Sequence, residues 1–178
     1  MDGELWDVTD ADGHPTGLTH RRGDPDFPVG RFHIVASVCL VRGDGRVLMT
    51  RRAAIKDYPL SWEFPAGSAL AGETSAEGAA RELHEEAGVP LDVTQLVLVG
   101  RVVEKTALFD LYAAHVPGDP PVVLDPEEVC ESEWVTFAEA LRRGDAGEMA
   151  DPWVPRLTKL GGRLAEFVEP EDSRRNRG

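Results

Sequence analysis

Three glutamates, Glu82, Glu85 and Glu86, follow one another closely in a segment of helical character. Steps of three and four residues place them on one side of a helix. Like charges this close repel each other, and the only cation inside the cluster is Arg81, whereas a solvated helix face usually intersperses both signs. A divalent metal ion would relieve the repulsion, because hard cations such as Mg²⁺ bind carboxylate oxygens together with substrate phosphates. The cluster therefore indicates metal-dependent chemistry on a phosphate compound.

The segment around this cluster resembles the Nudix box, whose pattern is G-x5-E-x7-R-E-U-x-E-E-x-G-U, with U aliphatic. Every fixed position is filled, from Gly67 through Glu73 and Arg81 to Gly88 and Val89. The resemblance implies that the three glutamates hold one or more Mg²⁺ or Mn²⁺ ions. It also implies that Arg81 reaches back to Glu73 and orients the carboxylates, while Gly67, Glu73 and Gly88 have structural parts in the motif.

Local signals agree with a helix that carries the box. Thr74 and Glu77 have the spacing of a capping box, so the helix is expected to begin near Ser75, and Gly88 with Pro90 marks its end. Its apolar residues are mostly small, which suits close packing of one face on a sheet while the carboxylates point outward.

The stretch before the box, from Trp62 to Gly67, is interpreted as the strand and turn that deliver it, with Pro65 setting the turn. By the resemblance, the backbone carbonyl of Ala66 is a metal ligand. Relatives often have glycine there, and alanine keeps the carbonyl. Glu63 either lines the pocket or lies on the solvent face of its strand.

Cations follow the preceding strand in the sequence, at Arg51, Arg52 and Lys56. Guanidinium and ammonium groups in this place could bind a diphosphate or the group attached to it. Solvated surface positions are the equal alternative.

An acidic run downstream, residues 125–135, resembles the family's late loop and strand. Either Glu133, directly before Trp134, or Glu127 or Glu128 in the loop could approach the metal site, where Glu133 or Glu128 would act as the general base, and the box itself offers Glu82. Metal coordination lowers the pKa of a bound water, and general-base assistance typically contributes about 10²–10⁴-fold. The alternative is that the run is simply acidic surface.

The groups attached to the diphosphate are recognised by scattered loop residues, so no local motif names the substrate. We predict a metal-dependent pyrophosphohydrolase that cleaves a nucleoside diphosphate linked to another moiety, with ADP-ribose as the first guess. A proline beyond the box that is associated with that substrate is absent, since Lys105 and Thr106 lie there. Nucleoside triphosphates, dinucleoside polyphosphates and coenzyme A remain open as substrates.

Two other readings stay open. The N-terminal half, with Trp6 and an Arg51-Arg52 pair, loosely resembles isopentenyl-diphosphate isomerases of the same superfamily, but residues 61–65 lack the catalytic cysteine of those enzymes. Because that cysteine is missing, His33 is interpreted as a core or pocket histidine rather than a metal ligand. A nucleotide-binding sensor without catalysis is the second alternative, and the intact set of box carboxylates argues against it.

Composition restricts the partners. The formal net charge of −13 and a pI near 4.7 disfavour binding to nucleic acid or an anionic membrane. A small-molecule diphosphate remains compatible, because a bound metal inverts the local field. The two cysteines indicate neither a disulfide framework nor a zinc site, and no leader or membrane span is evident, so a cytoplasmic location is expected. Dimerisation is common in the family, and the residues decide neither for nor against a homodimer.

The pattern of strands and helices predicts an α/β fold, which the resemblance specifies as a Nudix-type α/β/α sandwich with a mixed β-sheet between helices. We predict one domain over residues 1–168, with residues 1–32 as an N-terminal extension packed on it and a disordered tail over 169–178. Expected strands cover 4–8, 33–41, 46–51, 96–103, 107–116 and 131–137. Expected helices, besides that of the box, cover 138–143 and 153–167.

Overall fold

The centre of the sheet is a parallel pair of long apolar strands. The computed structural model describes residues 3–169 of the chain. In it, β3 (His33–Arg42) pairs in parallel with β8 (Ala107–Val116) along their whole lengths. Near-continuous runs of apolar residues are typical of strands that are covered on both faces. The sheet therefore needs helices on either side.

The remaining strands extend this pair into a mixed sheet. The order is β5-β4-β3-β8-β7, with β6 also pairing with β3 and β9 with β4, and all these further pairings are antiparallel. Their bounds are β4 (Arg46–Arg52), β5 (Trp62–Glu63), β6 (Ala66–Ser68), β7 (Val97–Val103) and β9 (Val129–Thr136).

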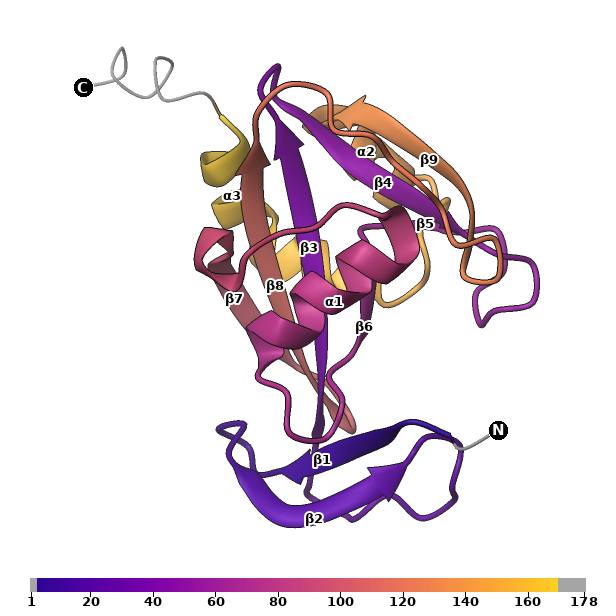
Figure 1. The fold of residues 1–178 in the computed structure, drawn as a ribbon, viewed down its shortest axis with the longest axis vertical. Coiled ribbons are helices and arrows are strands. Elements are labelled where there is room, and N and C mark those ends of the chain that lie inside the picture. The colour runs from indigo at the N-terminus through magenta and orange to yellow at the C-terminus, as the bar shows by residue number, and fades with distance from the viewer. Residues whose placement is uncertain (1–2, 170–178) are drawn as a thin grey trace.

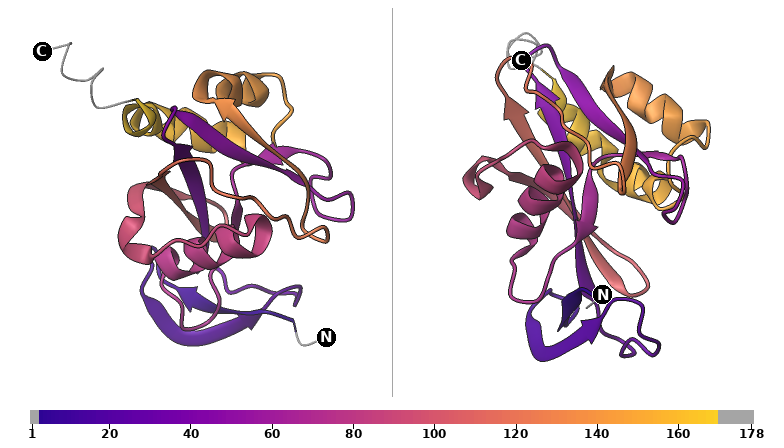
Figure 2. Two further views of the ribbon diagram at one scale, coloured as in Figure 1. Left: turned by 45° about the horizontal axis from the view of Figure 1, so that its top comes forward. Right: turned by 45° about the vertical axis from the view of Figure 1, so that its right-hand side comes forward.

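Helices cover both faces of the sheet (Figure 1). Helix α1 (Ser75–Ala87) lies on one face, and α2 (Phe137–Asp145) and α3 (Trp153–Val168) lie on the other (Figure 2). Successive residues of β3 point to opposite faces, so Val38 packs in the core under α1 while Cys39 packs in the core under α3. The predicted α/β/α sandwich with a mixed sheet is confirmed.

Helix α1 begins and ends where its caps predict. The Thr74 side chain accepts a hydrogen bond from the backbone of Glu77, whose own side chain accepts from the backbone of Thr74. At the other end Gly88 has a φ of 68°, and an added Cβ would lie 2.9 Å from Val123. Both the left-handed backbone and the close neighbour require glycine there.

The N-terminal segment forms a separate hairpin of β1 (Leu5–Thr9) and β2 (Pro15–Arg21), seen at the bottom of Figure 1. Strand β2 was not predicted, because its sequence has few apolar residues and all of its side chains are exposed or half-buried. The ring of Trp6 stacks on that of His33 at 4.3 Å, so His33 packs against the hairpin.

The other expected strands and helices begin and end within two residues of the observed ones, and η1 (Val93–Gln95) is a short 3₁₀ turn that was not predicted. The tail predicted over 169–178 lies, apart from Glu169, outside the described residues. Between residues 3 and 169, no helix is both long and apolar enough to span a bilayer.

Candidate active site

A pocket of about 290 Å³ opens beside α1, and elements from both halves of the chain line it. Its walls come from β3, β6 and α1, from the end of β4 and the loop after it, from the loop before β9, and from the residues at the open end of the N-terminal hairpin. The lining residues are Glu4, Arg22, Val35, Arg52, Lys56, Ala66, Gly67, Ser68, Glu82, Glu85, Glu86, Asp125 and Glu128.

The three glutamates of α1 meet this pocket at different depths. Glu86 is 4% exposed, the side chain of Glu82 is 14% exposed and that of Glu85 is 53% exposed. Burial raises the pKa of Glu86 well above its usual range, and the nearby carboxylates of Glu63 and Glu82 raise it further. Burial also raises the pKa of Glu82, although Arg81 opposes this shift.

One oxygen of Glu86 lacks any partner. Its Oε2 is fully buried and makes no hydrogen bond. Buried polar atoms in proteins are nearly always paired, and a buried carboxylate without a partner is costly. A divalent cation at Glu86 would supply the missing partner, and the nearby carboxylates of Glu82 and Glu85 are oxygen donors of the kind that Mg²⁺ and Mn²⁺ bind.

Arg81 holds the carboxylates around it in place. Its guanidinium donates to Glu73 at 2.9 Å, to Glu82 and to Glu85 at 2.8 Å each, and to the backbone oxygen of Ser68 at 2.9 Å. Glu73 in turn accepts from the backbone nitrogen of Leu70, which ties it to the loop before α1. Arg81 thus contacts Glu73 as the resemblance implies, and it fixes one oxygen of Glu82.

Strand β6 passes very close to Glu82. A Cβ added at Gly67 would lie 2.0 Å from the carboxyl carbon of Glu82. Only glycine leaves room for that carboxylate, which explains on steric grounds why the first position of the box is glycine. Ala66 lies in the pocket wall next to it.

The NUDIX domain model matches residues 31–157, which is most of the chain and includes every segment that lines the pocket except the N-terminal hairpin. The chain belongs to the Nudix hydrolase family. The uncharacterized Nudix hydrolase lmo0368 of Listeria monocytogenes is 40% identical over 93 residues, which are 51% of this chain and 54% of that protein. The chain therefore matches only about half the length of this curated relative.

One further relative and one solved structure cover more of this Nudix chain. An isopentenyl-diphosphate Delta-isomerase of Cereibacter sphaeroides is 31% identical over 164 residues, covering 86% of this chain and 85% of the isomerase. The crystal structure of DR0079 from Deinococcus radiodurans covers 83% of this chain and 92% of its own, with a TM-score of 0.68 at 23% identity. The latter likeness concerns the fold.

Among the cations predicted to bind substrate, two reach the pocket of this Nudix domain. Arg52 donates to Glu63 at 2.7 Å, and Lys56 forms a close ion pair with Glu128. Arg51 does not line the pocket, because its guanidinium is held by the backbone oxygen of Leu60 and by the carboxylate of Glu131.

The structure separates the candidates for the general base. Glu128 and Glu82 line the pocket, but Glu133 does not. Neighbouring residues of a strand point to opposite faces, and Glu133 of β9 points to the face that carries α2, where it pairs with Arg143. The prediction that Glu133 approaches the glutamates of α1 is corrected on this ground.

Glu63 lies in a second cavity of about 160 Å³, which shares Val35, Arg52 and Ala66 with the first. Glu63 is 5% exposed, and burial raises its pKa, although the ion pair with Arg52 opposes this. Its position on the solvent face of β5, the alternative considered from the sequence, is excluded. The wall of this cavity also contains Tyr58, Trp153 and Arg156.

Two pocket residues, Glu4 and Arg22, had no signal in the sequence, because they lie far upstream of the box and outside any motif. Asp125 was seen only as part of the acidic run. Elsewhere in the described part of the chain, the carboxylates of Asp10 and Asp12 lie within 4.8 Å of a ring nitrogen of His14. Asp10 there accepts from the backbone nitrogens of the other two, which is an ordinary turn around an aspartate.

Proposed function

We propose that the chain is a metal-dependent pyrophosphohydrolase that cleaves a nucleoside diphosphate linked to another moiety. The observation that carries the proposal is the buried, partnerless oxygen of Glu86 beside Glu82 and Glu85, facing a pocket whose other wall holds Arg52 and Lys56. Carboxylates for a cation and cations for an anion, set across one pocket, suit a phosphate anhydride that binds together with a metal.

In this proposal the carboxylates bind the metal ion. Glu82, Glu85 and Glu86, with the backbone carbonyl of Ala66, would hold Mg²⁺ or Mn²⁺. When bound, such an ion neutralises charge on the phosphate oxygens and makes hydroxide available near neutral pH.

The cations would orient the diphosphate. Arg52 is fixed by Glu63 and by the backbone oxygen of Asp57 at 2.6 Å, so its remaining N–H groups are held in one direction. Lys56 pairs with Glu128 in the pocket wall, where its ammonium group would bind a phosphate oxygen. Arg81 donates its hydrogen bonds to carboxylates and to the backbone oxygen of Ser68, so its role is to position Glu82 and Glu85.

The proton of the attacking water would go to Glu82 or to Glu128. Burial raises the pKa of Glu82, which favours it as a proton acceptor, and Arg81 donates to only one of its two oxygens. Glu128 is more exposed and lies on a loop. A Glu128→Gln variant that keeps its activity would leave Glu82 as the base.

The second cavity supports a substrate with a group on each side of the diphosphate. It opens directly beside the first, across Arg52 and Ala66, and it offers an aromatic wall and the guanidinium of Arg156. ADP-ribose, in which adenosine and ribose flank the diphosphate, is the first candidate on this ground. We also infer a single Nudix domain over residues 1–168, with residues 1–32 as its extension.

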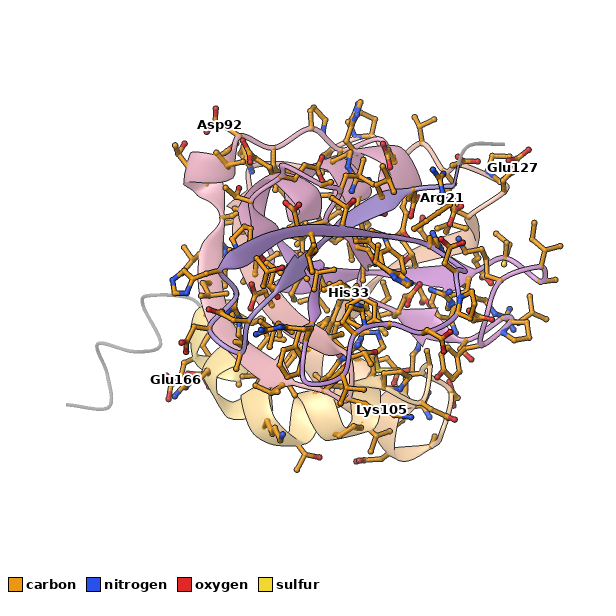
Figure 3. All side chains as sticks on the ribbon, turned by 90° about the horizontal axis from the view of Figure 1, so that it is seen from below. Arg21, His33, Asp92, Lys105, Glu127 and Glu166 are labelled. Carbon is orange, nitrogen blue, oxygen red and sulfur yellow. The ribbon has the colours of Figure 1, made fainter. Side chains whose placement is uncertain are left out.

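The test is the release of phosphate and nucleotide from a panel of diphosphate compounds, with Mg²⁺ or Mn²⁺ present or chelated. Glu86→Gln should lose at least about 10²-fold in rate. Glu127→Gln is the matched control, because Glu127 is exposed in the acidic loop and does not line the pocket (Figure 3). Cleavage that is indifferent to chelation, or equal in both variants, would refute the proposal.

The isomerase relative supports a second candidate function, isomerisation of isopentenyl diphosphate. Neither cysteine serves it, since Cys39 is buried in the core and Cys130 on β9 does not line the pocket. Isopentenyl diphosphate belongs in the same panel, and its conversion without cleavage would replace the hydrolase. Tight binding of a nucleotide without conversion would instead support the sensor.

A further inference from the structure

The N-terminal hairpin, which lies outside the segment that matches the NUDIX domain, reaches the pocket with two charged residues. Glu4 directly precedes β1 and Arg22 directly follows β2, so they face each other at the open end of the hairpin. The backbone nitrogen of Arg22 donates to the backbone oxygen of Glu4 at 2.8 Å, and its guanidinium donates to the Glu4 carboxylate at 3.0 Å.

The hairpin is fixed to the loop that leads into α1. The backbone nitrogen of Ala71 donates to the oxygen of Leu5 at 2.7 Å, and that of Gly72 donates to the side chain of Asp7 at 2.8 Å. Both contacts lie within the box segment. The stack of Trp6 on His33 adds a third attachment, at the start of β3. The end of the hairpin therefore has a defined place relative to the glutamates of α1.

Figure 3 shows the molecule from the side of the hairpin. In this view Arg21, the residue before Arg22, and Glu127, the residue before Glu128, are drawn toward the same side of the molecule. Because Arg22 and Glu128 line one pocket, the hairpin and the acidic loop both contribute to its wall.

The ion pair of Arg22 is the most exposed of the three that involve a pocket cation. Its two side chains are 50% and 41% exposed, against 15% and 6% for Arg52 with Glu63. Lys56 and Glu128 lie between these extremes, at 18% and 39%. Exposed pairs contribute only about 0–1 kcal/mol, so a phosphate can take Arg22 from Glu4 at little cost. Guanidinium groups bind phosphate oxygens with two parallel hydrogen bonds.

We propose that Arg22 binds an anionic group of the substrate, a phosphate of the diphosphate, and that the N-terminal hairpin is a substrate-binding part of the site, with Glu4 holding Arg22 until substrate arrives. This inference rests on the proposed function for its substrate class. It gives the hairpin a role in substrate binding, although the hairpin lies outside the segment that matches the NUDIX domain.

Two variants break the ion pair between Arg22 and Glu4, and together they distinguish a role of Arg22 in substrate binding from a role in holding the hairpin together. Arg22→Ala removes the binding group, so the KM for the cleaved diphosphate should rise about tenfold while kcat changes less than about threefold. Glu4→Gln keeps Arg22 and removes its competitor, so KM should stay equal or fall. If the ion pair only held the hairpin together, both variants would shift KM in the same direction.

The control is Arg31→Ala, which removes one positive charge from the same N-terminal segment at an exposed position outside the pocket. Its KM should match that of the wild type. Arg22→Lys should fall between wild type and Arg22→Ala, because lysine keeps the charge and loses the paired hydrogen bonds.

A binding measurement tests the inference without turnover. Calorimetric titration with α,β-methylene-ADP, in which carbon bridges the two phosphorus atoms, should give a dissociation constant about tenfold higher for Arg22→Ala than for wild type or Arg31→Ala. Equal constants in all three proteins, or no binding to any of them, would overturn the assignment. If wild type cleaves diphosphates but Arg22→Ala behaves like it, this inference alone fails. If wild type cleaves nothing, the proposed function fails, and the titration still decides whether Arg22 binds the anion.

Discussion

Glu86→Gln should stabilise the protein when metal is removed. The Oε2 of Glu86 has no partner, and burial of the side chain, followed by repulsion from the carboxylates of Glu63 and Glu82, raises its pKa. A buried polar atom without a partner costs about 1–3 kcal/mol, and glutamine replaces the repelled oxygen with an N–H₂ group that can donate to either neighbour. We therefore expect the variant to gain about 1–2 kcal/mol in the free energy of unfolding in chelator. For a chain of this size, that is a rise in Tm of about 2–8 °C.

Metal should reverse the order of the two proteins. A cation that binds only the folded state stabilises it by about 2.7 kcal/mol at a concentration of one hundred times Kd, or roughly 5–10 °C in Tm. Wild type should show this rise with Mg²⁺, and Glu86→Gln should show little of it.

Thermal unfolding followed by circular dichroism, with chelator and then with Mg²⁺, measures both effects at once. Glu127→Gln serves as the control and should follow wild type within about 0.5 kcal/mol in each condition. A variant that is less stable than wild type in chelator would contradict the view that Glu86 is held in an unfavourable state for the metal. An undiminished Mg²⁺ shift in the variant would show that the ion binds elsewhere.

Three further substitutions test the site and its frame. Gly67→Ala should lower kcat/KM at least about 10²-fold in a steady-state assay, because the new Cβ occupies the place of the Glu82 carboxylate; near-normal activity would mean that the carboxylate moves freely. Gly88→Ala should lower the free energy of unfolding by about 1–2 kcal/mol in a urea titration, since it puts a side chain at a φ of 68° and against the neighbouring loop, and an unchanged midpoint would argue against this cap. Glu133→Gln should keep kcat within about twofold, because Glu133 pairs with Arg143 on the other face of the sheet, and a loss of about 10²-fold would restore Glu133 as the base.

The sequence predicts the frame of the site well where local chemistry decides the outcome. Thr74, Glu77 and Gly88 set the ends of α1 through hydrogen bonds and backbone freedom that belong to those residues alone, and both ends agree with the structure. Strands β3 and β8 can likewise be predicted from their own residues, because a strand buried on both faces has few polar positions.

Positions that depend on long-range packing were not predictable in this way. Whether Glu133 points toward α1 or away from it depends on the register of β9 against β4, which no residue near Glu133 encodes. Strand β2 is exposed, has few apolar residues and pairs with β1. Arg22 reaches the pocket only because that hairpin lies against the box segment. Such residues need the tertiary structure to be found.

The parallel pairing of β3 with β8 has a consequence for how the protein acquires its site. Everything from β4 to β7 lies in the long loop that this pairing closes, including the whole of the box. Closing a long loop costs entropy before any contact compensates for it, so the central pairing is expected to form late in folding. The glutamates, the loop cations and the floor of the pocket would then assemble in one cooperative step. Substitutions of buried residues in β8 should accordingly lower the fraction of correctly folded, active molecules and leave the kcat of each folded molecule unchanged.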